Sequence, residues 1–188
     1  MLFRSVSQSR YGYPWFAAAG TRRGTIDNAN NIGYLDSETG EFQVVKNRVE
    51  IRDILYTNNI NPLTYLNGVG LVNYGNKNSK DTSSAWNRTN VSRLVNYLRA
   101  KVEIAARPFI FEPNDELTRS EVREVINSIM IDLVGKRGIT DYIVQCDSAN
   151  NTPERIDRNE LWIDIAVIPM KAIEFIYIPI RLVNTGDI

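Results

Sequence analysis

Histidine is absent from this chain of 188 residues, and cysteine occurs only once, as Cys146. The missing histidine removes the commonest general base and the commonest metal ligand of proteins. A single cysteine excludes an internal disulfide and indicates a reducing compartment. Basic and acidic residues balance at 22 each, so no net charge draws the chain to nucleic acid. Catalysis, if any, would fall to carboxylates, cysteine, lysine or tyrosine.

Long apolar runs are also missing, since none approaches the ~18 residues that a membrane-spanning helix needs. The most apolar stretches are residues 161–168 and 172–183, which are rich in β-branched and aromatic residues and predict buried strands. Residues 169–171 are too few for a crossover helix, so an antiparallel pair is predicted. Pro179 cannot donate a ladder hydrogen bond, which places it at an edge, a bulge or a segment that leaves its own subunit. A long apolar strand near a chain end needs something to cover or pair it.

The first half of the chain predicts small elements. Residues 1–24 show no sustained period and are expected to form an extended N-terminal segment. Two short strand-like runs flank a turn at 36–40, and together they predict a hairpin over 32–45. A helix is predicted over 48–59 and a short strand within 68–75, followed by an exposed loop.

Two amphipathic helices are predicted in the second half. Residues 90–107 place one apolar stripe on a helix, and residues 118–134 place another. The stripes consist of Val91, Leu94, Val95, Leu98, Val102 and Ala105, and of Val122, Val125, Ile126, Ile129, Leu133 and Val134. Thr118 and Glu121 have the spacing of a capping box, which predicts where the second helix begins. Residues 141–147 then predict a strand.

These elements predict the α+β class, with a mixed β-sheet packed by two main helices and extended terminal arms. The predicted strands of that sheet are residues 70–74, 142–146, 161–168 and 173–182. The domain division expected from this pattern is an N-terminal segment 1–24, a core 25–183 and an arm end 184–188.

Candidate chemistry is sparse. Cys146 lies in a strand-like run without a histidine to generate its thiolate, which favours a buried structural cysteine. Five carboxylates lie close in the sequence and could hold a metal for a hydrolase or nuclease, namely Asp147, Glu154, Asp157, Glu160 and Asp164. Arg155 and Arg158 share their loop, so ion pairs and caps are the simpler interpretation. A nucleic-acid-binding module is a second alternative, weakened by the lack of basic excess.

The ordered motifs resemble the C-terminal part of contractile phage tail sheath proteins. They are PWFAAAGTRRG (14–24), EIRDILYTNNINP (50–62), GVGLVNYGNK (68–77), the run 90–123 and GKRGITDYIVQCDSANNTPERIDRNEL (135–161). The string CDSANNTPERIDRNE is the most specific of them. Family members are usually much longer, with further domains before the PWF motif, so we expect a piece of a longer protein or a portion supplied separately.

The resemblance implies a structural protein of the virion tail, assembled in the host cytoplasm, with no enzymatic activity and no cofactor, metal or catalytic residue. It implies a homo-oligomer of six-fold rings stacked into a helical sheath that contracts around an inner tail tube protein. Baseplate and tail terminator proteins are its further implied partners, and nucleic acid and membrane are not. In this family, terminal arms add strands to the sheets of neighbouring subunits.

Two groups of residues are candidates for these contacts. The inter-subunit arm is expected to include Arg181, Leu182, Val183, Asn184 and Thr185, with a frayed terminus as the alternative. The tube-facing candidates are Glu112, Asp115 and Glu116, or Lys136 and Arg137 beyond the other end of the same helix. For these the alternative is that the charges only cap and solvate a surface helix.

Overall fold

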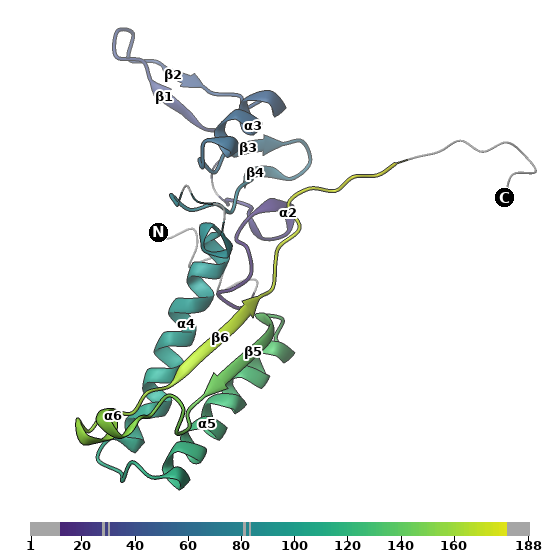
Figure 1. The fold of residues 1–188 in the computed structure, drawn as a ribbon. Coiled ribbons are helices and arrows are strands. Elements are labelled where there is room, and N and C mark those ends of the chain that lie inside the picture. Colours follow the sequence, from purple (N-terminus) through teal and green to yellow (C-terminus); the bar gives the residue numbers. More distant parts are fainter. Residues whose placement is uncertain (1–11, 28, 30, 81, 83, 180–188) are drawn as a thin grey trace, which may run out of the picture.

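The structure is a computed structural model that describes residues 12–27, 29, 31–80, 82 and 84–179. The described chain is elongated, with a hairpin at one end and the two long helices at the other (Figure 1). The helices are α2 (Gly20–Arg23), α3 (Val49–Thr57), α4 (Thr89–Ala106), α5 (Glu116–Gly135) and α6 (Pro153–Asp157), with 3-10 turns η1 (Ala85–Asn87) and η2 (Arg107–Phe109). The strands are β1 (Gly33–Leu35), β2 (Phe42–Val44), β3 (Leu63–Leu66), β4 (Gly70–Asn73), β5 (Ile139–Gln145) and β6 (Asp164–Pro169).

The strands of the described residues form three separate two-stranded antiparallel sheets, β1–β2, β3–β4 and β5–β6. The α+β class and the hairpin around residues 36–40 are therefore confirmed. The single mixed sheet is wrong in detail, because β4 pairs with β3 and lies in a different sheet from β5 and β6. Strand β3 was not predicted.

The predicted pairing of residues 161–168 with 172–183 is also wrong for the described part of that range, residues 172–179. β6 pairs with β5 along its length, from Gln145↔Asp164 to Ile139↔Pro169. Residues 170–179 then continue away from the sheet without forming a strand (Figure 1). The physical reason is that residues 169–171 contain neither the glycine nor the asparagine that a tight hairpin turn requires.

The core lies between α4, α5 and the β5–β6 sheet. Its buried residues come from all of these elements and from the N-terminal segment: Trp15, Leu94, Leu98, Val122, Ile126, Met130, Leu133, Ile139 and Cys146. Both predicted helices are confirmed, and each presents part of its predicted stripe to this core. Val125 and Val134 are exposed instead, and Met130 takes a central position that the predicted stripe omitted.

Trp15 attaches the N-terminal segment to the end of α5. Its indole Nε1 donates a hydrogen bond to the carbonyl oxygen of Lys136 at 3.0 Å, and its ring packs edge-on against Tyr97. A Cβ on Gly138 would lie 3.2 Å from the indole ring, so this position has little room for a side chain. Part of the segment expected to be an arm is therefore seated in the core.

The start of α5 differs from the predicted capping box. Asp115 is the N-cap residue, and its carboxylate accepts a hydrogen bond from the backbone N–H of Thr118 at 2.8 Å. The helix begins before the predicted position because aspartate is as good an N-cap as threonine. None of the described helices is both long and apolar enough to cross a lipid bilayer.

Candidate assembly interface

The segment that follows β6 is attached to the body through one acidic residue. Arg88, between η1 and α4, binds the Glu174 carboxylate with two N–H groups, and the Nη2–Oε2 distance is 2.8 Å. The side chains of Arg88 and Glu174 are 29% and 17% exposed, so the pair is largely shielded from water. A bidentate arginine–carboxylate pair fixes orientation as well as position.

Tyr56 completes this attachment from α3. Burial is the main cause that raises its pKa to about 12, and the charge of Glu174 and a hydrogen bond to that carboxylate raise it further. The Lys77 ammonium lies 4.4 Å from the centre of the Tyr56 ring and donates to the Tyr56 carbonyl at 2.6 Å. Glu174 therefore sits in a polar socket built from α3, the loop after β4 and the start of α4.

The apolar residues around Glu174 face outward. Ile173, Phe175, Ile176, Tyr177 and Ile178 are between 65% (Phe175) and 87% (Tyr177) exposed. Folded chains normally bury such side chains and leave the charged one in water. Here the arrangement is reversed, and an uncovered apolar stretch of this size marks a candidate contact surface.

A groove lies between this segment and the body. Residues from α2 and α3 line one side, including Arg22, Arg52 and Tyr56, and residues 172–176 line the other. Gly75 also lines this groove and is buried, and a Cβ there would come within 2.8 Å of the Asn61 Cα.

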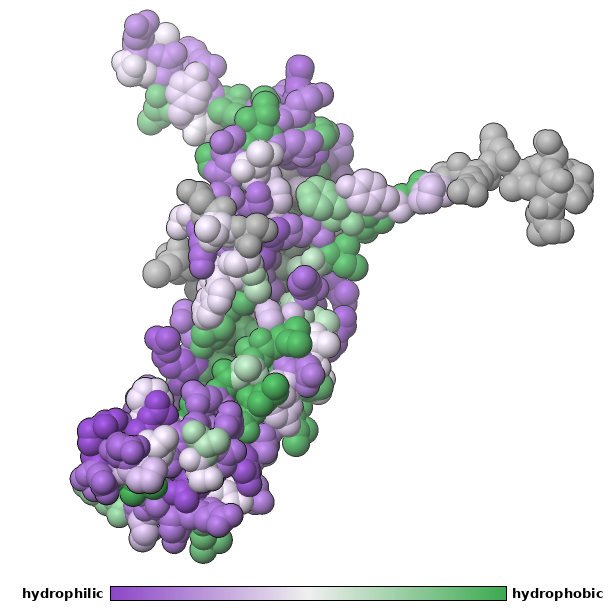
Figure 2. Space-filling model, in the orientation of Figure 1, coloured by the Kyte–Doolittle hydropathy of each residue, from purple (hydrophilic) through white to green (hydrophobic). Residues whose placement is uncertain are grey.

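The β5–β6 sheet offers open edges for such a contact. Within the described residues, neither strand has a second neighbour. Helix α5 packs against β5, while Ile143 and Ile168 are 67% and 58% exposed. Apolar residues run along this region and into the segment after β6 (Figure 2).

The tube-facing candidates do not meet in one place. Asp115 and Glu116 lie at the start of α5, and Lys136 and Arg137 follow its end, about 30 Å away for a helix of this length. Asp115 is used as the helix cap, and the Lys136 ammonium pairs with Asp132 at 2.7 Å. Glu112 is exposed in the loop before α5. The arm candidates Arg181, Leu182, Val183, Asn184 and Thr185 lie outside the described residues.

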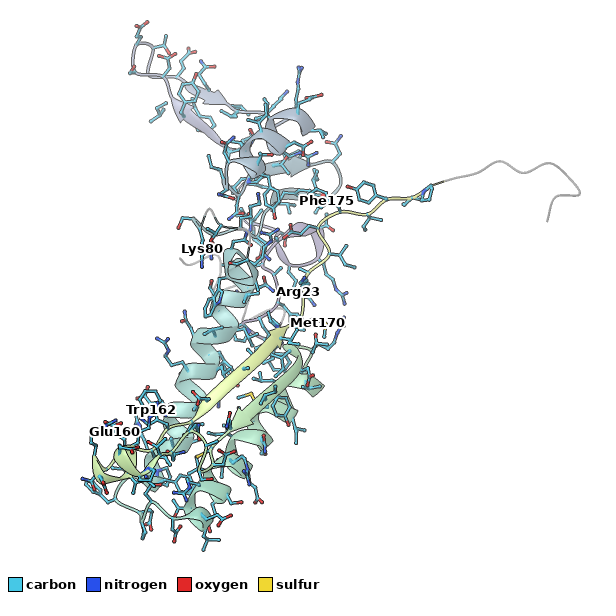
Figure 3. All side chains as sticks on the ribbon, viewed as in Figure 1. Arg23, Lys80, Glu160, Trp162, Met170 and Phe175 are labelled. Atoms are coloured by element: carbon cyan, nitrogen blue, oxygen red, sulfur yellow. The ribbon has the colours of Figure 1, made fainter. Side chains whose placement is uncertain are left out.

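The carboxylates of the hydrolase alternative do not converge. No group of three or more acidic or cysteine side chains suited to a metal occurs in the described part of the chain. The Ala149 backbone N–H donates to Asp147 and is the main cause that lowers the pKa of this carboxyl. Arg158 and the indole of Trp162 bind Glu160 and lower its pKa to about 2 (Figure 3). The alternative has no support.

Asn150 and Asn151 give a structural role to the string CDSANNTPERIDRNE (146–160). The buried Asn151 side chain accepts from the Trp162 backbone N–H at 2.7 Å and donates to the Trp162 carbonyl at 3.0 Å. The Asn150 amide donates to the Gln145 carbonyl and to Asp164. These bonds hold the end of β5 to the start of β6. Burial raises the pKa of the nearby Cys146 thiol, so this cysteine is structural rather than nucleophilic.

Arg88 and Glu174 were missed by sequence reasoning because 86 residues separate them. The available signal was that Glu174 is the only charged residue in the apolar run 172–180. A lone acid in such a run implies a dedicated cation, although the sequence does not identify which one.

Residues 81–182 match the family described as the phage tail sheath C-terminal domain. The tail sheath protein of Vibrio phage KVP40 is 38% identical over 163 residues, which cover 87% of this chain and 23% of that protein. The tail sheath protein of Enterobacteria phage T4 is 34% identical over 172 residues, covering 92% and 24% respectively. The chain thus spans about a quarter of the length of these curated relatives.

Solved structures share the fold. A chain in the baseplate of the anti-feeding prophage matches with a TM-score of 0.77 and 21% identity, covering 96% of this chain and 48% of that one. A chain in the contracted sheath complex of the extracellular contractile injection system PVC matches with a TM-score of 0.76 and 21% identity, covering 95% and 48%.

Proposed function

Because the chain belongs to the phage tail sheath C-terminal domain family, we propose that it is a structural subunit of a contractile tail sheath. Copies polymerise as stacked six-fold rings around an inner tube and shorten to drive the tube through the host envelope. The family is structural, so the proposal includes no catalytic step. The place of the protein is the virion tail.

One observation carries this proposal. The chain has both an uncovered apolar segment, 173–178, and a two-stranded sheet whose described edges are open. These two features fit one another, because an extended segment can add a strand to an open edge through main-chain hydrogen bonds. Beyond the part that lines the groove, the segment points away from the body of its own chain (Figure 1), so we propose that the edge it meets belongs to another copy.

The attachment at Glu174 fixes the point at which the exchanged segment leaves the body. Arg88 and Tyr56 hold the segment two residues before Ile176, so the apolar part leaves the body in one direction. A defined direction lowers the ordering cost of the contact. The continuation through Arg181, Leu182, Val183, Asn184 and Thr185 is proposed to complete the inter-subunit arm.

The proposed partners other than a second copy are the tube, the baseplate and a tail terminator protein. The tube contact has to release on contraction, which suits exposed charges better than an apolar patch. Glu112, Asp115 and Glu116 form one candidate surface, and Lys136 with Arg137 forms the other. Their separation along α5 means that a single tube subunit contact would use only one of them.

Concentration-dependent assembly tests the proposal. The chain should form rings or tubes visible by negative-stain electron microscopy, and Ile176→Asp with Ile178→Asp should abolish them while the fold is unchanged by circular dichroism. Ile104→Asp is the matched control, because Ile104 is also an exposed isoleucine but lies on α4. Assembly that survives the double substitution contradicts the strand-exchange mechanism, and a wild-type chain that stays monomeric contradicts the proposed function.

A further inference from the structure

The β1–β2 hairpin is the most isolated element of the described chain (Figure 1). Its strands pair with each other, and no other described element packs extensively on either. Leu35, Phe42 and Val44 lie on one side of it and are 71%, 54% and 46% exposed; they are called the hairpin face here. A two-stranded hairpin by itself is only marginally stable in water. Its uncovered apolar face therefore indicates that the hairpin packs against another surface.

The turn of this hairpin is acidic and well ordered. The Asp36 carboxylate accepts hydrogen bonds from the backbone N–H groups of Glu38 at 2.8 Å and Thr39 at 3.3 Å. Glu38 and Glu41 are exposed beside it, and neither forms an ion pair with any described residue. No lysine or arginine occurs from residue 24 through residue 45. The hairpin therefore presents a preformed negative end next to an apolar face.

The complementary surface lies where α2 and α5 end. Arg22, Arg23 and Arg137 gather there and are called the arginine patch here. The Arg23 guanidinium lies 4.4 Å over the ring of Phe16, and Arg23 lies near Met170, whose N–H donates to the carbonyl of Gly138 (Figure 3). Burial lowers the pKa of Arg23, and the positive charges of Arg22 and Arg137 lower it further.

The arginine patch lacks a carboxylate partner within the described part of the chain. Among those residues, none of its three arginines makes an ion pair, although each would be stabilised by a nearby anion. Apolar surface lies next to it, because Ile173 lines the same groove as Arg22 and is 83% exposed. Positive charge beside an apolar side chain matches the negative end and apolar face of the hairpin.

We propose that the hairpin of one copy docks on the arginine patch of a second copy, with Glu38 and Glu41 against the arginines and the hairpin face against Ile173. The hairpin points away from α2 of its own chain (Figure 1), so the contact joins different copies. The two surfaces differ, so the contact is heterologous and propagates, as a helical polymer requires. This inference rests on the proposed function and adds a second contact, which shares only Ile173 with the segment used in strand exchange.

A charge swap tests this contact. The first variant, Glu38→Lys with Glu41→Lys, makes the hairpin basic, and the second, Arg22→Glu with Arg23→Glu, makes the patch acidic. Each variant alone should need a roughly tenfold higher concentration to assemble, because two attractive contacts become repulsive. A 1:1 mixture should assemble like wild type, because each hairpin then finds a patch of opposite charge. The quadruple variant should also assemble alone.

Sedimentation velocity at several concentrations and salt levels provides the readout. Glu121→Lys with Glu124→Lys, on the exposed side of α5, is the matched control for the hairpin variant, because it makes the same change in net charge elsewhere and should leave assembly unchanged. If the wild type assembles but the single-surface variants assemble equally well, the docking contact is wrong and the proposed function stands. The docking contact is also wrong if both single-surface variants fail and neither the mixture nor the quadruple variant recovers. A wild type that never associates contradicts the proposed function itself.

Discussion

Arg88 and Glu174 lie 86 residues apart in the chain, and the guanidinium of one binds both carboxylate oxygens of the other. This pair connects the start of α4 to the segment that follows β6. Its side chains are mostly shielded, whereas the apolar neighbours of Glu174 are exposed. A polar residue thus anchors the segment and leaves its apolar residues exposed.

Removing this anchor should release the segment without unfolding the body. Glu174→Gln keeps the shape of the side chain but loses the charge. We expect the free energy that holds the segment to the body to fall by about 1.5–3 kcal/mol, the usual contribution of a hydrogen bond to a charged group. Hydrogen exchange of the amides in 172–178 should accelerate, while that of α5 should not. Glu103→Gln is the control, because the Glu103–Arg107 pair is about two-thirds exposed and should contribute about 0.5 kcal/mol or less. Equal protection of 172–178 in both variants would contradict the anchoring role.

The same anchor should weaken in alkaline solution. The pKa of Tyr56 is raised to about 12 in the folded chain, above the usual value of 10.0. A raised pKa means that the contribution to stability is complete below pH 10 and is lost as the pH rises from 10 toward 12. The difference in unfolding free energy between wild type and Tyr56→Phe should therefore shrink across this interval. Denaturant titrations of both proteins in steps from pH 9 to pH 12 measure it, and a constant difference would show that Tyr56 titrates normally.

The assignment of the core predicts that alanine substitutions at buried and exposed positions of α5 lower the free energy of unfolding by different amounts. Ile126 is 1% exposed and belongs to the central cluster, so Ile126→Ala should cost about 2–5 kcal/mol. Ile131 on the same helix is 62% exposed, and Ile131→Ala should change stability by about 0.5 kcal/mol or less. Chemical denaturation of the two variants measures both values. Similar losses would mean that the face of α5 has been assigned incorrectly.

The long helices could be predicted because their information is local. An apolar stripe sustained over 18 or 20 residues defines one buried face, and α4 and α5 follow it. The hairpin was predictable for the same reason, since its turn residues are contiguous. Strand pairing was not predictable, because an apolar run does not specify which strand it will join.

The segment 173–178 shows a second limit. Its composition predicts a buried strand, and in the folded chain it is neither buried nor paired within the described residues. The sequence pattern is the same whether the covering surface comes from the chain itself or from a second copy. For the candidate contacts, the sequence indicated charged residues near both ends of α5 but not the anchor at Arg88, which exists only in the folded chain.

Asp115 allows the capping role and the tube contact to be separated. Asparagine is as good an N-cap as aspartate, so Asp115→Asn should leave the stability of α5 nearly unchanged while removing the charge. Asp115→Ala removes both the charge and the cap, and we expect it to cost about 1 kcal/mol, since the Thr118 N–H loses its acceptor. Thermal unfolding measures the stability that the cap provides, and co-sedimentation with preformed tubes measures the tube contact.

The tube-contact role and the capping role predict different effects of these variants on assembly. If the acidic start of α5 meets the tube, Asp115→Asn combined with Glu116→Gln should weaken tube-templated assembly at full stability, and raised salt should weaken wild-type assembly in the same way. Tube-free polymerisation should be spared, because the strand exchange and the hairpin contact use other residues. If only Asp115→Ala affects assembly, in proportion to its loss of stability, Asp115 serves only as the cap. The tube contact is then to be sought at Lys136 and Arg137. Lys136→Gln is the equivalent neutral substitution, because Arg137 also belongs to the arginine patch and Arg137→Gln would alter both contacts.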